Sequence, residues 1–200
     1  HTDESGFSTR AVDTANVAMI SLTLRKEAFD SFKATTSQLG IDLMKMKNIF
    51  GMATKGDLIS IEMADNAQKM SVSVHGYHYS ITLLDTNTIR KDPNPPTISL
   101  PGKIVIKGED LNNAMKAAAV ISDKIALGIN PKDQTFYLIA EGDTDHIRRE
   151  FSKDELISLT PAEARSLFSL DYLKDMGKVM SRAAEVEIFL GIDHPVRFSF

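Results

Sequence analysis

Residues 43–63 read LMKMKNIFGMATKGDLISIEM, and residues 170–190 read LDYLKDMGKVMSRAAEVEIFL. The two stretches align without a gap, and every matched position in the second lies 127 residues after its counterpart in the first. The matched core and basic positions are Leu43 with Leu170, Met46 with Leu173, Lys47 with Lys174, Ile49 with Met176, Met52 with Val179, Lys55 with Arg182, Ile59 with Val186, Ile61 with Ile188 and Met63 with Leu190. Agreement over this length at one spacing indicates an internal duplication.

The first copy changes from helical to strand spacing within this stretch. Apolar residues at helical spacing predict a helix over 44–53, which Lys55-Gly56-Asp57 ends. Alternating apolar and polar residues then predict an antiparallel meander whose turns are Ala64-Asp65-Asn66 and Gly76. Its strands, together with two that precede the helix, are expected at 7–11, 17–24, 58–63, 69–74 and 77–84.

A proline-rich run, Asp92-Pro93-Asn94-Pro95-Pro96, interrupts this rhythm and can continue neither a helix nor a strand ladder. We therefore expect a first domain over 1–84, a connector over 85–101 and a second domain over 102–200. The second domain is expected to hold strands at 103–107, 125–129, 136–141, 146–152, 185–190 and 196–200, and helices at 110–122 and 171–183. Its opening strand and helix have no counterpart before His1, and the first domain's last strand has none after Phe200. The chain is thus expected to be cut at both ends.

Composition narrows the class of protein. With 200 residues, 42% of them hydrophobic, the chain can bury two modest cores. A net charge of −4 gives no global basic signature, so any contact with nucleic acid requires locally sorted charge. The absence of cysteine excludes disulfides and thiolate metal sites. The sequence has no apolar run near the ~18 residues that span a bilayer, so a membrane partner is not expected.

Motifs for catalysis or cofactor binding are not found in the sequence. His75 and His78 are close together, but zinc needs three or four converging ligands and no third is evident. The segment 51–56 lacks the Gly-Lys-Ser/Thr ending of a phosphate-binding loop. Asp143 and Asp145 indicate a hairpin tip rather than a catalytic carboxylate pair. We expect no enzyme activity, no metal and no cofactor.

Basic residues follow the predicted helices. Lys174, Lys178 and Arg182 recur every four residues and form a stripe on one helix face, which we call the basic stripe. Asp171 and Asp175 can pair with the two lysines, which favours the alternative of an ordinary solvated face. Recurrence on the other helices, at Lys45, Lys47, Lys55 and Lys116, favours a surface that faces phosphate. Acidic residues gather instead in loops and at strand ends.

With these features in place, the chain resembles the proliferating cell nuclear antigen family of sliding clamps. The resemblance covers nearly the whole sequence, and Asn16 and the proline-rich connector give it an archaeal character. Its most specific stretches are RAVDTANVAM at 10–19, LTLR at 22–25, Phe29-Asp30, ADNA at 64–67, Leu83-Leu84-Asp85 and His194-Pro195-Val196. The resemblance implies an α+β clamp fold in which two duplicated domains place helices inside a ring and antiparallel sheets outside.

The resemblance also implies a function and partners. We expect a non-catalytic homotrimer that encircles duplex DNA of any sequence inside an archaeal cell. It is expected to hold DNA polymerase, the clamp loader, flap endonuclease and DNA ligase through short peptide motifs.

Three groups of site residues follow from the resemblance. The expected DNA-facing residues are Lys45, Lys47, Lys55, Lys116, Lys174, Lys178 and Arg182. The expected partner-peptide pocket is Val12, Asp13, Asn16, Val17, Pro96, Ile98 and Leu100, although Val12 and Val17 could equally be core residues. The expected trimer interface is Tyr77, His78, Tyr79 and Ile81 against His146, Ile147, Arg148 and Arg149 of a neighbouring copy, since proteins seldom leave strand edges bare.

Two rival functions remain open at this point. One is a checkpoint-type clamp subunit that assembles with unlike partners. The other is a small-molecule enzyme or binding protein on a duplicated α+β frame, which requires a concave pocket with converging polar groups.

Overall fold

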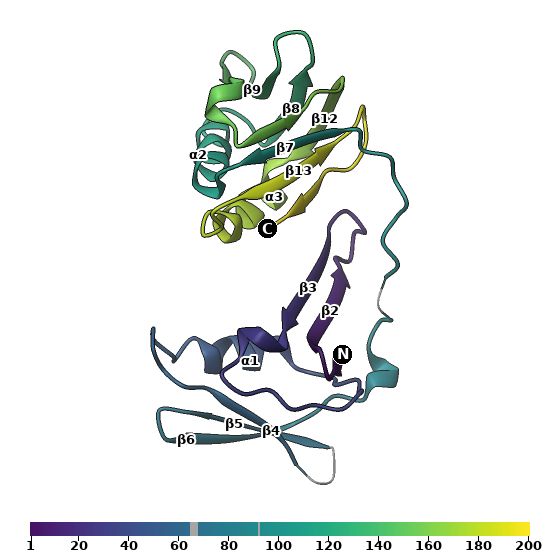
Figure 1. The fold of residues 1–200 in the computed structure, drawn as a ribbon, viewed down its shortest axis with the longest axis vertical. Helices are drawn as coiled ribbons and strands as arrows, with labels where there is room; N and C mark the ends of the chain where they lie inside the picture. Colours follow the sequence, from purple (N-terminus) through teal and green to yellow (C-terminus); the bar gives the residue numbers. More distant parts are fainter. Residues whose placement is uncertain (65–67, 92) are drawn as a thin grey trace. The chain divides into compact units, whose positions relative to one another are not determined.

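The computed structural model describes residues 1–64, 68–91 and 93–200. The chain folds into two compact units, residues 1–95 and 96–200, each built of antiparallel sheets and helices (Figure 1). The expected α+β class is confirmed. Asp65 and Asn66 of the predicted turn, and Asp92 of the proline-rich run, lie outside the described residues. Within the described ranges, no helix is long and apolar enough to cross a membrane.

The second unit holds two four-stranded antiparallel sheets and two helices. One sheet has the order β10-β9-β8-β12 and the other the order β11-β7-β13-β14. The strands are β7 (Gly102–Ile106), β8 (Lys124–Asn130), β9 (Thr135–Glu141), β10 (His146–Phe151), β11 (Ser158–Thr160), β12 (Ala164–Ser169), β13 (Val186–Leu190) and β14 (Arg197–Ser199). The helices are α2 (Gly108–Ala118) and α3 (Leu170–Met180), with a short 3-10 turn, η3, at Lys153–Glu155. Buried aliphatic side chains from both sheets and both helices form one core.

Helices α2 and α3 of this unit pack closely on each other because glycine stands at their contacts. A Cβ on Gly108 would lie 1.9 Å from the carbonyl oxygen of Met180. A Cβ on Gly177 would lie 3.1 Å from Oδ1 of Asn112, whose side chain is buried. The two helices therefore pack as one pair, and Asn112 belongs to their contact rather than to the exposed surface.

The first unit holds two three-stranded sheets and one helix. The sheets are β1-β2-β3 and β4-β5-β6, and both are antiparallel. The elements are β1 (Thr2–Asp3), β2 (Gly6–Val12), β3 (Met19–Arg25), α1 (Leu43–Phe50), β4 (Ser60–Met63), β5 (Lys69–Val74) and β6 (Tyr77–Thr82), with 3-10 turns η1 (Lys26–Ala28) and η2 (Thr86–Thr88). Asp42 caps α1 by accepting hydrogen bonds from the amides of Met44 and Lys45. The core of this unit lies between α1 and the second sheet, and its buried residues are Met46, Ile49, Met70, Val72, Val74 and Ile81.

The predicted duplication is confirmed by the order of elements. Helix α1 and helix α3 begin at positions 127 residues apart, and β4 with β5 follows α1 as β13 with β14 follows α3. The same apolar spacing has thus produced the same helix–strand–strand unit twice.

The helix ends differ from the expectation. The helices predicted over 44–53, 110–122 and 171–183 end earlier, at Phe50, Ala118 and Met180. After α1 the chain turns at Gly51, and after α3 the hydroxyl of Ser181 donates to the carbonyl of Lys178 at 2.8 Å. These local caps satisfy the last carbonyl groups of each helix. The spacing of apolar residues does not reveal such caps. Strands β1 (Thr2–Asp3), β11 and β12 also have no predicted counterpart.

Candidate DNA-facing and partner-binding surfaces

Helix α3 carries the first two residues of the basic stripe on its solvent side. Its other side is buried through Leu170, Leu173, Gly177 and Met180. Lys174 lies 4.0 Å from Asp171, and Lys178 lies 2.8 Å from Asp175. The ammonium of Lys178 lowers the pKa of Asp175, with a smaller contribution from Lys174. Lys178 is exposed and Lys174 is half-buried, and each has an acidic partner on the preceding turn.

The third residue of the basic stripe is not on the helix, which corrects the expectation. Arg182 follows the end of α3 at Met180, and Lys55 likewise follows the end of α1 at Phe50. Both are exposed. Because each helix ends early, these two cations extend from the turn that leads into the next strand. Their positions still correspond, since they occupy the same place in the two copies of the repeat.

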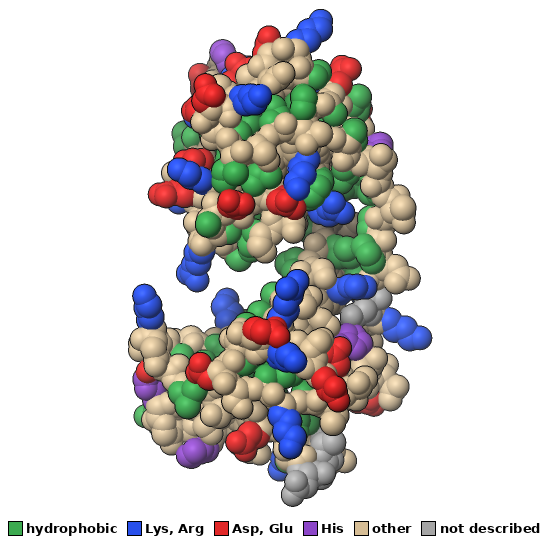
Figure 2. All heavy atoms as spheres, in the orientation of Figure 1, with side chains coloured by type: hydrophobic (Ala, Val, Ile, Leu, Met, Phe, Trp, Pro, Cys, Tyr) green, Lys and Arg blue, Asp and Glu red, His purple; other side chains and the backbone are tan. Residues whose placement is uncertain are grey.

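The remaining candidates for DNA contact lie on the other two helices. Lys45 and Lys47 are exposed on α1, and Lys116 is exposed on α2. The ammonium of Lys45 lies 3.7 Å from the carboxylate of Asp42, which also caps the helix. On the face drawn in Figure 2, basic and acidic side chains are interspersed over both units rather than segregated. Contacts with phosphate would therefore be made by individual cations, many of them with acidic neighbours.

The loop between β2 and β3, residues 13–18, carries three of the residues predicted for the peptide pocket, and we call it the docking loop. The Asp13 carboxylate accepts hydrogen bonds from the amides of Ala15, Val17 and Ala18 at 3.2, 2.7 and 3.0 Å. Asp13 therefore builds the loop, and its oxygens are occupied by backbone amides. Val17 is 65% exposed and Val12 is half-buried. Val17 is thus an accessible apolar side chain and not a core residue of its unit.

The predicted connector residues of the pocket belong to the second unit. Pro96 is exposed, and Ile98 and Leu100 are half-buried. A Cβ on Gly191 would lie 3.4 Å from Cδ2 of Leu100, so this leucine packs against Gly191. Ile98 and Leu100 both alternate with exposed residues, as an extended segment requires.

The strands predicted to form the trimer interface are both at sheet edges. Strand β6 pairs with β5 on one side, and β10 pairs with β9 on one side. Tyr77 and His78 are exposed, and Tyr79 is half-buried. Ile81 requires a correction, because its side chain is only 7% exposed and belongs to the core of its own unit. It can contribute backbone groups to an interface, but not its side chain.

On β10, the side chains already have partners within the chain. Ile147 packs against the core of the second unit. Arg148 donates to Glu150 at 2.6 Å and lies over the ring of Tyr137. Arg149 pairs with Glu155 and lies over the ring of Phe151. These contacts hold both guanidinium groups beside the strand edge, while His146 remains exposed.

One residue of this region, Arg90, was not predicted from the sequence. The guanidinium Nη2 of Arg90 donates to Oδ1 of Asn16 at 2.8 Å, which joins the start of the connector to the docking loop. The two residues are 74 positions apart, and no local pattern links them. The basic pair Arg90-Lys91 before the proline-rich run was the one available signal.

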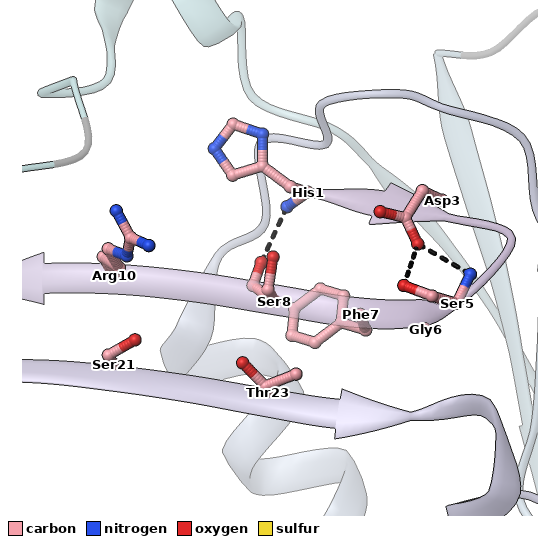
Figure 3. A pocket seen from close by; sticks show the side chains of 9 residues that line it. All are labelled: His1, Asp3, Ser5, Gly6, Phe7, Ser8, Arg10, Ser21 and Thr23. Carbon is pink, nitrogen blue, oxygen red and sulfur yellow. Dashed lines mark hydrogen bonds between the residues drawn. The ribbon is translucent and has the colours of Figure 1, made fainter.

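A hollow in the first unit lies along the hairpin of β2 and β3, at the end away from the docking loop (Figure 3). Its lining includes His1, Asp3, Phe7 and Arg10, and none of the residues predicted for the peptide pocket. The carboxylate of Asp3 accepts hydrogen bonds from the amide and hydroxyl of Ser5, which lower its pKa. In Figure 3 the hydrogen bonds drawn join Ser5 to Asp3 and the His1 amine to the carbonyl of Ser8, all close to the backbone of the hairpin.

Comparison with known proteins places the chain among archaeal relatives. The family model described as proliferating cell nuclear antigen, N-terminal domain, matches residues 1–86. The DNA polymerase sliding clamp of Methanoregula boonei is 81% identical over all 200 residues, which cover 81% of its length. That of Methanoculleus marisnigri is 64% identical over the same span. The solved structure of A. fulgidus PCNA bound to the C-terminal region of FEN-1 matches with a TM-score of 0.92 and 34% identity, over 98% of this chain and 79% of that one.

Proposed function

Because the chain belongs to the family of DNA polymerase sliding clamps, we propose that three copies close head to tail around duplex DNA. In this assembly the chain acts as a processivity factor that tethers DNA polymerase and other replication and repair proteins to their template. The clamp itself catalyses no reaction, and it works on chromosomal DNA inside an archaeal cell. Residues 85–101 serve as the connector between a domain over 1–84 and a domain over 102–200.

The observation that carries this proposal is the repetition of solvent-accessible cations at corresponding places in the two copies of the repeat. Lys47 on α1 corresponds to Lys174 on α3, and Lys55 corresponds to Arg182 in the turns that follow. Phosphate contacts of this kind do not depend on base sequence, because they read only the charge of the backbone. We assign Lys45, Lys116 and Lys178 to the same DNA-facing surface.

Copies of the chain are proposed to join through β6 of one and β10 of the next. Both are sheet edges in the described structure, and an edge strand readily pairs with another chain. Tyr77, His78 and Tyr79 supply side chains on one side, and Arg148 and Arg149 supply them on the other. Ile81 and Ile147 anchor the two strands to their own cores.

Partner proteins are proposed to dock by short peptides on the exposed apolar surface beside Val17. The related A. fulgidus protein is described as bound to the C-terminal region of FEN-1, which supports a peptide as the ligand. Flap endonuclease, DNA polymerase, DNA ligase and the clamp loader are the partners we assign to this surface. Pro96, Ile98 and Leu100 are proposed to line it from the connector.

The decisive experiment compares closed and open DNA. The full-length protein, loaded onto nicked circular DNA, is expected to remain bound until the circle is linearised, and then to run off the ends. Equal retention on circular and linear DNA would contradict encirclement. Light scattering of the protein alone separates a homotrimer, which we expect, from a subunit that needs unlike partners, which would remain monomeric.

A further inference from the structure

The contact between Arg90 and Asn16 joins two segments that the proposed function uses together. Arg90 lies at the beginning of the connector, and Asn16 lies at the tip of the docking loop. The 2.8 Å hydrogen bond runs from a charged guanidinium to an amide oxygen. Bonds of this charge-assisted kind are the stronger class of side-chain hydrogen bond.

The docking loop presents Asn16 in a fixed direction. Besides the carboxylate bonds of Asp13, the amide of Asn16 donates to the carbonyl of Asp13 at 3.1 Å. Asn16 has a φ of +57°, in the left-handed region that asparagine, aspartate and glycine enter more readily than other residues. The loop therefore holds its tip in one conformation, and the amide side chain extends from a fixed backbone.

Arg90 is also delivered by an ordered segment, residues 84–90, which we call the strap. The strap begins where the amide of Leu84 donates to the carbonyl of Gly40 at 2.8 Å. Asp85 then caps η2 by accepting from the amide of Asn87 at 2.9 Å. Ile89 packs on Gly40, since a Cβ there would lie 2.9 Å from its Cδ1. Both ends of the Arg90–Asn16 bond are thus supported by independent local structure.

We propose that Arg90 is a positioning residue for peptide docking, and that it latches the strap to the docking loop. This inference rests on the proposed docking of partner peptides beside Val17. A loop already held in place loses less conformational entropy when a peptide binds, so the latch raises affinity without touching the peptide. Asn16 is its partner because it combines a left-handed backbone with an acceptor oxygen.

The test is calorimetric titration of a short peptide, with one hydrophobic and two aromatic residues on a helical turn, into the full-length protein. Arg90→Ala and Asn16→Gly should each weaken binding by about three- to tenfold, because each removes one end of the bond. Glycine keeps the left-handed backbone, so Asn16→Gly tests the acceptor. Asn16→Asp keeps an acceptor oxygen for the Arg90 guanidinium and should lose less affinity than Asn16→Gly. Lys91→Ala is the matched control, since it removes a neighbouring exposed charge, and it should leave affinity unchanged.

The double variant distinguishes a latch from general loosening of the loop. Arg90→Ala made in the Asn16→Gly background should cause no further loss, because the bond is already gone. Additive losses, or an Arg90→Ala variant that binds like the wild type, would overturn the latch while leaving peptide docking intact. Absence of binding by the wild type would overturn the docking proposal and the latch together.

Hydrogen exchange in the free protein tests the latch without any peptide. Arg90→Ala should speed exchange of the amides in the docking loop and in the strap, while exchange in the β8–β9 hairpin stays as it was. Unchanged protection of both segments would refute the latch whatever the titrations show.

Discussion

The pairing of Lys178 with Asp175 leads to a prediction about how strongly the protein holds DNA. Asp175→Asn removes the carboxylate that lies 2.8 Å from the Lys178 ammonium. Both side chains are largely exposed, at 79% and 68%, and the buried face of α3 is untouched. The variant should therefore fold normally and release one lysine per chain for contact with phosphate.

The size of the effect follows from counterion release. Each phosphate neutralised on duplex DNA contributes about 0.9 to the slope of log affinity against log salt concentration. Each added contact therefore makes the loss of affinity between about 50 and about 200 mM salt roughly 3.5-fold larger. The wild type itself should bind weakly, with a dissociation constant of about 10⁻⁴ to 10⁻⁶ M at physiological salt.

The assay is fluorescence anisotropy of a labelled duplex over a series of salt concentrations. Asp143→Asn, at the β9–β10 turn, is the control, because it changes net charge by the same amount away from α3. If Asp175→Asn gives the same slope as Asp143→Asn, the lysine pair does not face phosphate. The reverse change, Lys174 and Lys178 to Glu, should preserve assembly and abolish stimulation of processive synthesis at moderate salt.

Other changes test separate parts of the structure. Ile147→Pro should yield monomers by light scattering, because proline removes a backbone donor from β10, and an unchanged trimer mass would locate the interface elsewhere. Val17→Asp should weaken peptide binding by more than about 2 kcal/mol in calorimetry while trimerisation survives, since it places a charge in an apolar site; equal affinities would mean that partners dock elsewhere. Gly108→Ala should lower the melting temperature of the second unit markedly, because its Cβ would meet a backbone oxygen at 1.9 Å; an unchanged transition would contradict the close packing of α2 on α3. The hydrogen bond from Arg149 lowers the pKa of Glu155 to about 2. Glu155→Gln should therefore lower the free energy of unfolding at pH 6 to 7. The difference between variant and wild type, measured by unfolding at several pH values, should shrink below the ordinary glutamate pKa and vanish as the pH falls towards 2.

The periodic parts of the fold could be predicted from the sequence. Apolar spacing in 43–63 and 170–190 identified both helices and the strands that follow them, because burial of one face imposes a period on each element. The same alternation could have revealed that Ile81 shares a face with Tyr79 and points into the core. Ile81 was assigned to the interface from the resemblance, which identifies a strand but does not say which sheet face each of its side chains occupies.

Features that depend on individual side-chain hydrogen bonds could not be predicted. The end of α3 is set by the cap at Ser181, and the exposure of Val17 is set by the Asp13 turn, which delays β3 until Met19. The Arg90–Asn16 bond depends on how two distant segments fold back, and sequence separation hides such contacts. The positions of the basic stripe could be predicted from the sequence. Its role could not, because pairing with Asp171 and Asp175 is compatible with both a phosphate-facing surface and an ordinary solvated face.

The correspondence between Lys47 and Lys174, and between Lys55 and Arg182, has a consequence for movement along DNA. In the proposed assembly of three chains, each pair of corresponding cations contributes six copies to one ring, three from each unit. A duplex repeats every 10–10.5 base pairs or so, and six copies do not match that repeat. At any angle some cations approach a phosphate while others leave one, and the gains and losses largely cancel. Friction against sliding is then low because the symmetries are mismatched, even though every individual contact is attractive.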